Sequence, residues 1–258
     1  MQGLPLVSII TTVLNNKEDI EDAIKSVLNQ TYLNIEYIII DGESTDGTIE
    51  TINKYQKKIS KFISEKDRGV YDGMNKGIRM ASGEIIGILN SDDIYASNNV
   101  IEKVVRIMEK NNVDCCWGDL VYVDEKDTNK IIRYWKSSEY KPGKFKKGWM
   151  PPHPTFFVRK WVYEKYGKFN LDFPISADYE LMLRFLEKYK IRSCYIPQVM
   201  VKMRIGGQSN KNIINIIKGN IECYKSWKIN GLKINPLIFF LKPLSKISQY
   251  FKRSHLNL

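Results

Sequence analysis

The sequence is poor in histidine and cysteine, which limits the sites it can form. Its 258 residues include only 2 histidines and 4 cysteines. The cysteines form no C-x-x-C pair and show no zinc-ligand spacing, so neither a zinc site nor a disulfide framework is expected. We expect reduced, mostly buried thiols in a cytosolic protein. They are Cys115, Cys116, Cys194 and Cys223.

Long apolar runs and targeting signals are also missing. No apolar stretch approaches the roughly 18 residues that a membrane-spanning helix needs. The N-terminus lacks the basic-then-apolar order of a signal peptide. The sequence therefore predicts a chain that is neither exported nor membrane-spanning.

Apolar and basic residues are abundant. Hydrophobic residues make up 43% of the chain and aromatic residues 12%, which is enough to bury a core in one large or two small domains. The 40 Lys and Arg exceed the 29 Asp and Glu, giving a formal charge of +11. This excess indicates an anionic partner, namely nucleotide phosphates, nucleic acid or an acidic membrane surface.

Apolar, β-branched runs alternate with segments of helical spacing along the first half of the chain. Strands are predicted at 6–13, 35–40, 61–64 and 85–89, with helices between them. A polar turn at 125–129 between two apolar runs predicts a hairpin, and a helix is predicted at 176–186. The pattern predicts an α/β fold with a mixed, mostly parallel sheet flanked by helices.

Acidic residues follow the predicted strands. Asp41, Asp67, Asp92 and Asp93 each come where a strand ends, and ligands collect at the carboxyl edge of such sheets. Asp92 and Asp93 supply the oxygen ligands that Mg²⁺ and Mn²⁺ prefer. The alternative for this pair is a turn or a helix N-cap.

The character of the chain changes near residue 213. Ile213, Ile214, Ile216 and Ile217 predict a packed helix, and the residues that follow interleave aromatic side chains with lysine and arginine. We therefore divide the chain into a domain at 1–212 and a C-terminal basic and aromatic amphipathic helical segment at 213–258. One interpretation of this segment is contact with an anionic bilayer, and the other is packing on the domain with a solvated lysine face.

Four motifs together resemble the family 2 glycosyltransferases of the GT-A fold, a Rossmann-like architecture. They are SIITTVLN at 8–15, DGESTDGT at 41–48, NSDD at 90–93 and ADYE at 177–180, and the resemblance covers roughly residues 4–210. Segments 65–77 and 152–157 are most similar to bacterial transferases that assemble O-antigen, capsule or exopolysaccharide repeat units.

The resemblance implies an inverting, metal-dependent enzyme. It would transfer a hexose from a nucleotide sugar, expected to be a UDP-sugar, to a lipid-linked (polyprenyl diphosphate) saccharide at the inner face of the cell membrane. Asp178 matches the general base. Asp93 is the preferred Mn²⁺ or Mg²⁺ ligand, with Asp92 nearer the ribose, and Asn90 replaces an Asp that the family often has. The expected nucleotide-sugar pocket comprises Thr11, Asn15, Asp41, Ser44, Asp67, Arg68, Asn75, Asn90, Asp92, His153 and Arg204.

Some of these residues also have simpler interpretations. Arg68 fits a surface ion pair, His153 a structural histidine, and Arg204 with the loop at 206–209 an ordinary turn. Glu180 fits either orientation of the acceptor or capping of the helix.

Two other functions compete with glycosyl transfer. A sugar-phosphate nucleotidyltransferase would need a glycine-rich turn after the first strand, and residues 11–17 contain no glycine. A non-catalytic membrane or nucleic-acid module would account for the positive charge. Because the basic residues concentrate in the C-terminal part and the expected pocket is acidic, we expect a peripheral membrane protein without a nucleic-acid partner. The sequence leaves a homodimer open.

Overall fold

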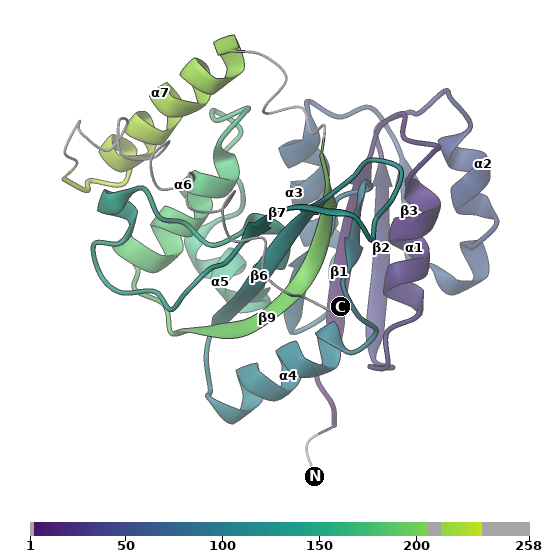
Figure 1. The fold of residues 1–258 in the computed structure, drawn as a ribbon, viewed down its shortest axis with the longest axis horizontal. Coiled ribbons are helices and arrows are strands. Elements are labelled where there is room, and N and C mark those ends of the chain that lie inside the picture. Colours follow the sequence, from purple (N-terminus) through teal and green to yellow (C-terminus); the bar gives the residue numbers. More distant parts are fainter. Residues whose placement is uncertain (1–2, 206–212, 234–258) are drawn as a thin grey trace.

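The structure, a computed structural model, describes residues 3–205 and 213–233. Its strands form one nine-stranded sheet in the order β3-β2-β1-β4-β8-β6-β9-β5, with β7 paired to β6. Helices cover both faces of this sheet (Figure 1). The prediction of a mixed, mostly parallel sheet flanked by helices is confirmed.

The first four strands form the parallel part of the sheet. Three of them are rich in β-branched residues and largely buried, as expected for strands covered on both faces, whereas the outer strand is partly exposed. Val13 is in register with Asp41, and Asp41 with Ser64, so the strands end at one edge. They are β1 (Val7–Val13), β2 (Ile35–Asp41), β3 (Lys61–Ser64) and β4 (Ile85–Ile88).

Neighbouring residues of β1 enter different cores. Ile10 packs in the core beneath α3, α5 and α6, whereas Ile9 packs in the core beneath α1, α2 and α4. This follows from the period of two along a strand. These helices are α1 (Ile20–Leu28), α2 (Thr48–Asn53), α3 (Val70–Met80), α4 (Val100–Lys110), α5 (Lys160–Tyr166) and α6 (Ala177–Leu183).

Every antiparallel pairing includes a strand from the second half of the chain. The predicted hairpin is present as β6 (Cys115–Val123) and β7 (Ile131–Trp135). No sequence pattern predicts β5 (Asp93–Tyr95), because its three residues are too few to show a period. It pairs with the last strand, so that Asp93 lies opposite Met203. The remaining strands are β8 (Phe157–Arg159) and β9 (Ser193–Arg204).

The helix predicted at 176–186 begins at Ala177 and continues from Arg184 as a π-helical turn. Ser176 does not cap it, because its hydroxyl donates to the carbonyl of Gly219 at 3.2 Å. Glu180 is buried against Arg184, with Oε1 3.0 Å from Nε. It therefore neither caps the helix nor faces an acceptor.

Helix α7 (Ile213–Ile229) packs against α6 on the side of the molecule away from α2 (Figure 1). The indole of Trp227 donates to the hydroxyl of Tyr179 at 2.9 Å, and Cys223 is buried beside it. The expectation that Ile216 and Ile217 pack inward is wrong, since both are about half exposed. Residues 234–258 of the predicted C-terminal segment lie outside the described residues.

The sequence also predicted that the chain has no membrane-spanning helix and that its cysteines are reduced and mostly buried. No helix within 3–205 and 213–233 is both long enough and apolar enough to cross a membrane. Cys115, Cys116 and Cys223 are buried thiols, and Cys194 is partly buried.

Candidate active site

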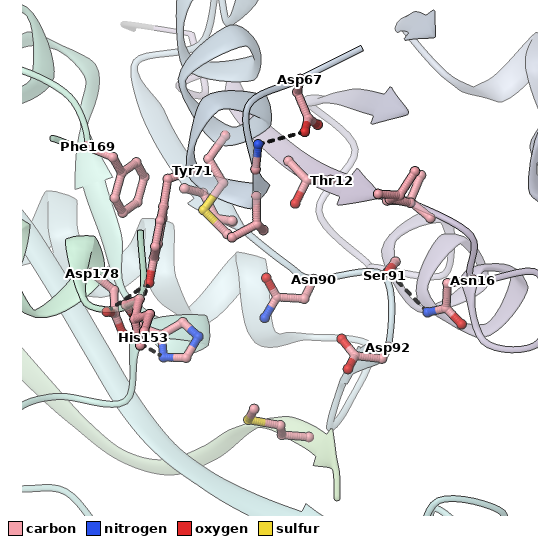
Figure 2. Close-up of a pocket in the computed structure, with 18 of the residues that line it drawn as sticks. Thr12, Asn16, Asp67, Tyr71, Asn90, Ser91, Asp92, His153, Phe169 and Asp178 are labelled. Carbon is pink, nitrogen blue, oxygen red and sulfur yellow. Dashed lines mark hydrogen bonds and ion pairs between the residues drawn. The ribbon is translucent and has the colours of Figure 1, made fainter. Parts of the chain in front are cut away.

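A cavity of about 500 Å³ opens at the carboxyl ends of β1 and β4. Its two sides differ in chemistry, as Figure 2 shows. We call one side the polar wall, formed by Thr12, Asn15, Asn16, Asp67, Asn90, Ser91 and Asp92. We call the other the aromatic wall, formed by Tyr71, His153, Phe156, Phe169 and Asp178.

Hydrogen bonds join the loops of the polar wall. The backbone N–H of Asn15 donates to the hydroxyl of Ser44 at 2.8 Å, and the Asn15 side-chain oxygen accepts from the N–H of Thr45 at 2.8 Å. Asn15 has a φ of 49°, a left-handed conformation that asparagine tolerates better than most residues. The amide of Asn16 donates to Ser91 at 3.0 Å. The loops after β1, β2 and β4 are therefore fixed to one another before any ligand binds.

The two threonines at the end of β1 point to opposite faces of the sheet. Thr11 is fully buried, with its hydroxyl 3.1 Å from that of Tyr37, and does not reach the cavity. Thr12 lines the cavity, and its Oγ1 has no hydrogen-bond partner within the described residues. The residue predicted for the pocket is thus one position away from the residue that lines it.

Asp41 and Ser44 lie behind the polar wall. One carboxylate oxygen of Asp41 accepts from the N–H of Ser44 at 3.0 Å and the hydroxyl of Ser64 at 2.7 Å. The other is buried and has no partner in the described part of the chain. Neither residue lines the cavity directly, whereas Asp67 does, with Oδ1 accepting from the N–H of Gly69 at 2.9 Å.

Of the two consecutive acids, only Asp92 faces the cavity. Asp93 is fully buried in β5, and its Oδ2 accepts from the side chain of Asn90 at 2.8 Å. Burial and the adjacent Asp92 raise the pKa of Asp93 well above its ordinary value, which favours the neutral acid. Asp93, expected as the preferred metal ligand, therefore does not line the cavity, whereas its neighbour Asp92 does.

Asp178 lies in the first turn of α6, on the aromatic wall. Its Oδ2 is 3.3 Å from Nδ1 of His153, and its Oδ1 is 3.1 Å from the hydroxyl of Tyr71. That hydroxyl also lies 3.0 Å from the carbonyl of Ile175, so its single proton is shared between two acceptors. Burial, together with the charge of Asp178, raises the pKa of Tyr71 well above its ordinary value, which keeps the phenol protonated.

Comparison with known proteins identifies the family. The model of the family described as "Glycosyl transferase family 2" matches residues 8–167. The chain belongs to glycosyltransferase family 2. A glycosyltransferase of Haemophilus influenzae is 31% identical over 236 residues, which are 83% of this chain and 70% of that protein. A PGL/p-HBAD biosynthesis glycosyltransferase of Mycobacterium bovis is 26% identical over 211 residues, covering 80% of each chain.

Solved structures of GT-A glycosyltransferases share the fold. A mannosyltransferase of Pyrobaculum calidifontis, in complex with GDP-Man and Mn²⁺, superimposes with a TM-score of 0.65 at 16% identity, covering 99% of this chain and 77% of that one. TarS of S. aureus, in complex with UDP-GlcNAc, gives a TM-score of 0.63 at 13% identity, covering 98% and 74%. The GT-A fold expected from the motifs is therefore confirmed.

The polar wall of this family 2 glycosyltransferase fits a divalent cation that is held partly by substrate. Asp92 supplies one carboxylate, and Ser91 and Asn90 supply neutral oxygens beside it. Within residues 3–205 and 213–233, no three His, Cys, Asp or Glu side chains form a cluster for a metal ion. One carboxylate completed by phosphate oxygens and water is the arrangement that Mg²⁺ commonly uses.

Two further predicted pocket residues of the glycosyltransferase lie outside the cavity. Arg68 does not line the cavity, and its side chain is 80% exposed beside Asp72. Asn75 is buried and exchanges two hydrogen bonds with the backbone of Phe169, at 2.9 and 3.0 Å. It therefore positions an aromatic side chain of the cavity and does not line the cavity itself.

Arg204 borders the cavity, but its guanidinium is already paired. Nε lies 3.2 Å from Oδ1 of Asp19, and a terminal nitrogen pairs with Asp22. Another nitrogen donates to the carbonyl of Asp92 at 2.9 Å. Arg204 thus fixes the loop that carries Asp92, and contact with a nucleotide sugar would require some of these bonds to break. The loop at 206–209 lies outside the described residues.

Sequence reasoning missed Thr12, Tyr71 and Phe169. Thr12 needed only the correct strand face, and Tyr71 lies inside the segment 65–77 that carries the family resemblance. Phe169 stacks on Tyr71 with ring centroids 5.3 Å apart. No motif surrounds it, so only the fold reveals its position.

Proposed function

We propose that this glycosyltransferase is an inverting, metal-dependent hexosyltransferase. It moves a hexose from a nucleotide sugar, a UDP-sugar by preference, to a hydroxyl of a lipid-linked saccharide during surface polysaccharide biosynthesis. The observation that carries the proposal is a single cavity with Asp92 on the polar wall and Asp178 on the facing aromatic wall. UDP-GlcNAc and GDP-Man complexes of the structural neighbours support a nucleotide-sugar donor.

The polar wall would bind the nucleotide diphosphate. The unpaired Asp41 oxygen and the free Thr12 hydroxyl are polar groups near this wall that lack partners in the described residues. A carboxylate oxygen can accept from a base N–H, and a hydroxyl can bind ribose or phosphate. A divalent cation bound at Asp92 would neutralise charge on the diphosphate leaving group.

Asp178 would act as the general base. One of its oxygens takes the proton from the acceptor hydroxyl while that hydroxyl oxygen attacks the anomeric carbon from the face opposite the diphosphate. The carbon–oxygen bond to the nucleoside diphosphate breaks as the new glycosidic bond forms, so the configuration inverts. Tyr71 and His153 fix the direction of the carboxylate. Phe169 and Tyr71 offer apolar faces for a sugar ring.

A donor screen tests the proposal. The purified full chain is incubated with UDP-, GDP- and deoxythymidine diphosphate-linked hexoses, with Mn²⁺, with Mg²⁺ and with EDTA, and release of nucleoside diphosphate is measured. We expect release from one or a few donors, strongest with UDP-sugars and lost with EDTA. If no donor in the panel released nucleoside diphosphate and none bound, a donor site in this cavity would be refuted.

We also propose a peripheral location at the inner face of the cell membrane. An acceptor with a polyprenyl diphosphate carrier stays in the bilayer, so the enzyme must meet it at the surface. The basic charge of the chain and the exposed isoleucines of α7 support this location.

A further inference from the structure

A second hollow, of about 440 Å³, lies between α7 and the segment that leads into α6. Pro174 and Ile175 form one side of it, and Lys218, Ile221 and Lys225 form the other. Lys218 and Lys225 are seven residues apart, close to two helical turns, so both lie on the same face of α7.

The charge in this hollow is net positive and unpaired. Glu222 also borders it, but its Oε2 already accepts from the N–H groups of Ile175 at 3.0 Å and Ser176 at 2.7 Å. Among residues 3–205 and 213–233, Lys218 and Lys225 take part in no ion pair. Two ammonium groups beside a satisfied carboxylate provide donors for an anion.

Exposed isoleucines lie beside the two lysines on α7. Ile217 is 54% exposed, Ile221 50% and Ile229 56%. The opposite face of α7, with Cys223 and Trp227, is buried against α6. A helix that exposes isoleucines among lysines while its other face is already packed fits a membrane interface, where apolar side chains enter the acyl boundary and lysines meet phosphate.

The hollow adjoins the cavity of the active site through one residue. Ile175 lines both. Its carbonyl lies 3.0 Å from the hydroxyl of Tyr71, which in turn lies 3.1 Å from Oδ1 of Asp178. A phosphate bound at Lys218 and Lys225 would therefore lie next to the aromatic wall, where the acceptor hydroxyl is expected.

We propose that this hollow binds the phosphate of an anionic membrane lipid, and that the isoleucines of α7 enter the bilayer beside it. The assignment of that lipid to the class of the lipid-linked acceptor rests on the proposed function. A free phosphate would make no use of the isoleucines, and nucleic acid would leave them in water. The charge and the exposed apolar area together favour a lipid.

Vesicle binding of the full chain tests the proposal. Cosedimentation is measured with phosphatidylcholine vesicles that contain phosphatidic acid, and with vesicles of phosphatidylcholine alone. We expect binding to the former and little to the latter. The double variant Lys218→Gln with Lys225→Gln should bind roughly thirtyfold more weakly, since each lysine at a surface contributes about a factor of five. Ile217→Ser with Ile221→Ser should also weaken binding.

A matched control removes the same charge elsewhere. The control is the double variant Lys57→Gln with Lys58→Gln. Both lysines belong to the short helical turn Gln56–Lys58 after α2, away from α7 (Figure 1). This variant should change vesicle binding less than twofold. If both double-lysine variants lost vesicle binding equally, net charge alone would explain the loss and the proposal would be overturned. Unchanged vesicle binding of the Lys218 and Lys225 variant would overturn it as well. Full displacement from vesicles by soluble glycerol phosphate would overturn the lipid assignment.

Nucleotide binding measured on the same samples separates this proposal from the proposed function. Vesicle binding that depends on Lys218 and Lys225, without any nucleotide binding, would contradict the proposed function alone. Nucleotide binding without such vesicle binding would contradict the lipid site alone. Circular dichroism and thermal unfolding of each variant verify that the chain is folded.

Discussion

The polar wall and the aromatic wall reach the same cavity by different routes. Residues of the polar wall lie at the end of β1 and in the loops after β1, β3 and β4, and hydrogen bonds such as that between Asn16 and Ser91 join two of these loops. The aromatic wall combines α3, the segment around His153, Phe169 and the first turn of α6, which are far apart in the chain. One wall is fixed by strand ends, and the other by packing between distant elements.

The largest expected effect separates the two walls. Asp178→Asn should lower the rate of sugar transfer roughly a thousandfold, because the amide cannot accept the acceptor proton. The dissociation constant for the nucleotide, measured by calorimetry, should change less than twofold. A parallel loss of nucleotide binding would mean that the two walls do not act separately.

Asp92→Asn should weaken both binding and transfer. The amide offers a cation far less charge than the carboxylate does, and we expect transfer to fall roughly a hundredfold. Mn²⁺-dependent nucleotide binding should weaken in the same samples. Asp172→Asn, at an exposed acid outside the cavity, is the matched control and should leave both measurements unchanged. A normal metal dependence in the Asp92 variant would remove Asp92 from the metal site.

Glu36 stabilises the amino ends of β1 and β2, the strands whose other ends lead to the polar wall. Its buried carboxylate lies 2.7 Å from the Lys61 ammonium and accepts from Ser8 at 2.5 Å and from the N–H of Ser82 at 2.7 Å. Burial alone would raise the pKa of Glu36, but the bonds from Lys61, Ser8 and Ser82 outweigh it and lower the pKa to about 2. Because the pKa of Glu36 is lower in the folded protein than in the unfolded chain, the ionised carboxylate stabilises the fold.

Glu36→Gln should therefore lower the free energy of unfolding by about 2–3 kcal/mol at neutral pH. In the native protein this contribution is complete above about pH 4.5 and is lost as the pH falls toward 2. Urea unfolding across that range measures both effects. A difference between variant and native protein that stays constant from pH 7 to pH 2 would contradict the role of the charge.

Tyr71→Phe examines the support of the base on the aromatic wall. Loss of the hydroxyl removes a donor to the Asp178 carboxylate, and a hydrogen bond to a charged group contributes about 1.5–3 kcal/mol. We expect kcat to fall roughly tenfold or more with the donor KM unchanged. Tyr189→Phe, which removes an exposed hydroxyl away from the cavity, is the control. A raised donor KM would instead give Tyr71 a role in donor binding.

The smallest effect is expected at Arg68. Because its side chain is exposed and outside the cavity, Arg68→Ala should change transfer and nucleotide binding less than twofold. A large loss in steady-state kinetics would show that Arg68 turns into the cavity when the donor binds.

The polar wall was largely readable from the sequence. β-branched runs predicted β1 and β4, and the motif at 90–93 predicted acids at the edge of the sheet. The errors within it are small displacements. Thr11 and Thr12 are chemically identical, and only the face of the strand decides which one lines the cavity. Asp93 is buried because β5 pairs with β9, and no local sequence pattern predicts that pairing.

Residues of the aromatic wall could be predicted from the sequence only where they lie in a family motif. Asp178 and His153 were predicted from family motifs, and the structure brings them together at 3.3 Å. Asn75 and Phe169 are linked by hydrogen bonds across 94 residues, so their relation depends on the tertiary fold. The same holds for Arg204, whose pairing with α1 is not encoded near either partner.

The contacts of Arg204 also bear on how the protein is made. Arg204 and Asp22 are 182 positions apart in the chain, yet their pairing helps to fix the loop that carries Asp92. A growing polypeptide on the ribosome cannot form this contact until β9 has emerged. Contacts of such long range slow folding, because a large loop must close before they form. The loop that carries Asp92 should therefore be among the last parts of the domain to become ordered during synthesis. Chains that terminate before residue 204 should bind nucleotide poorly.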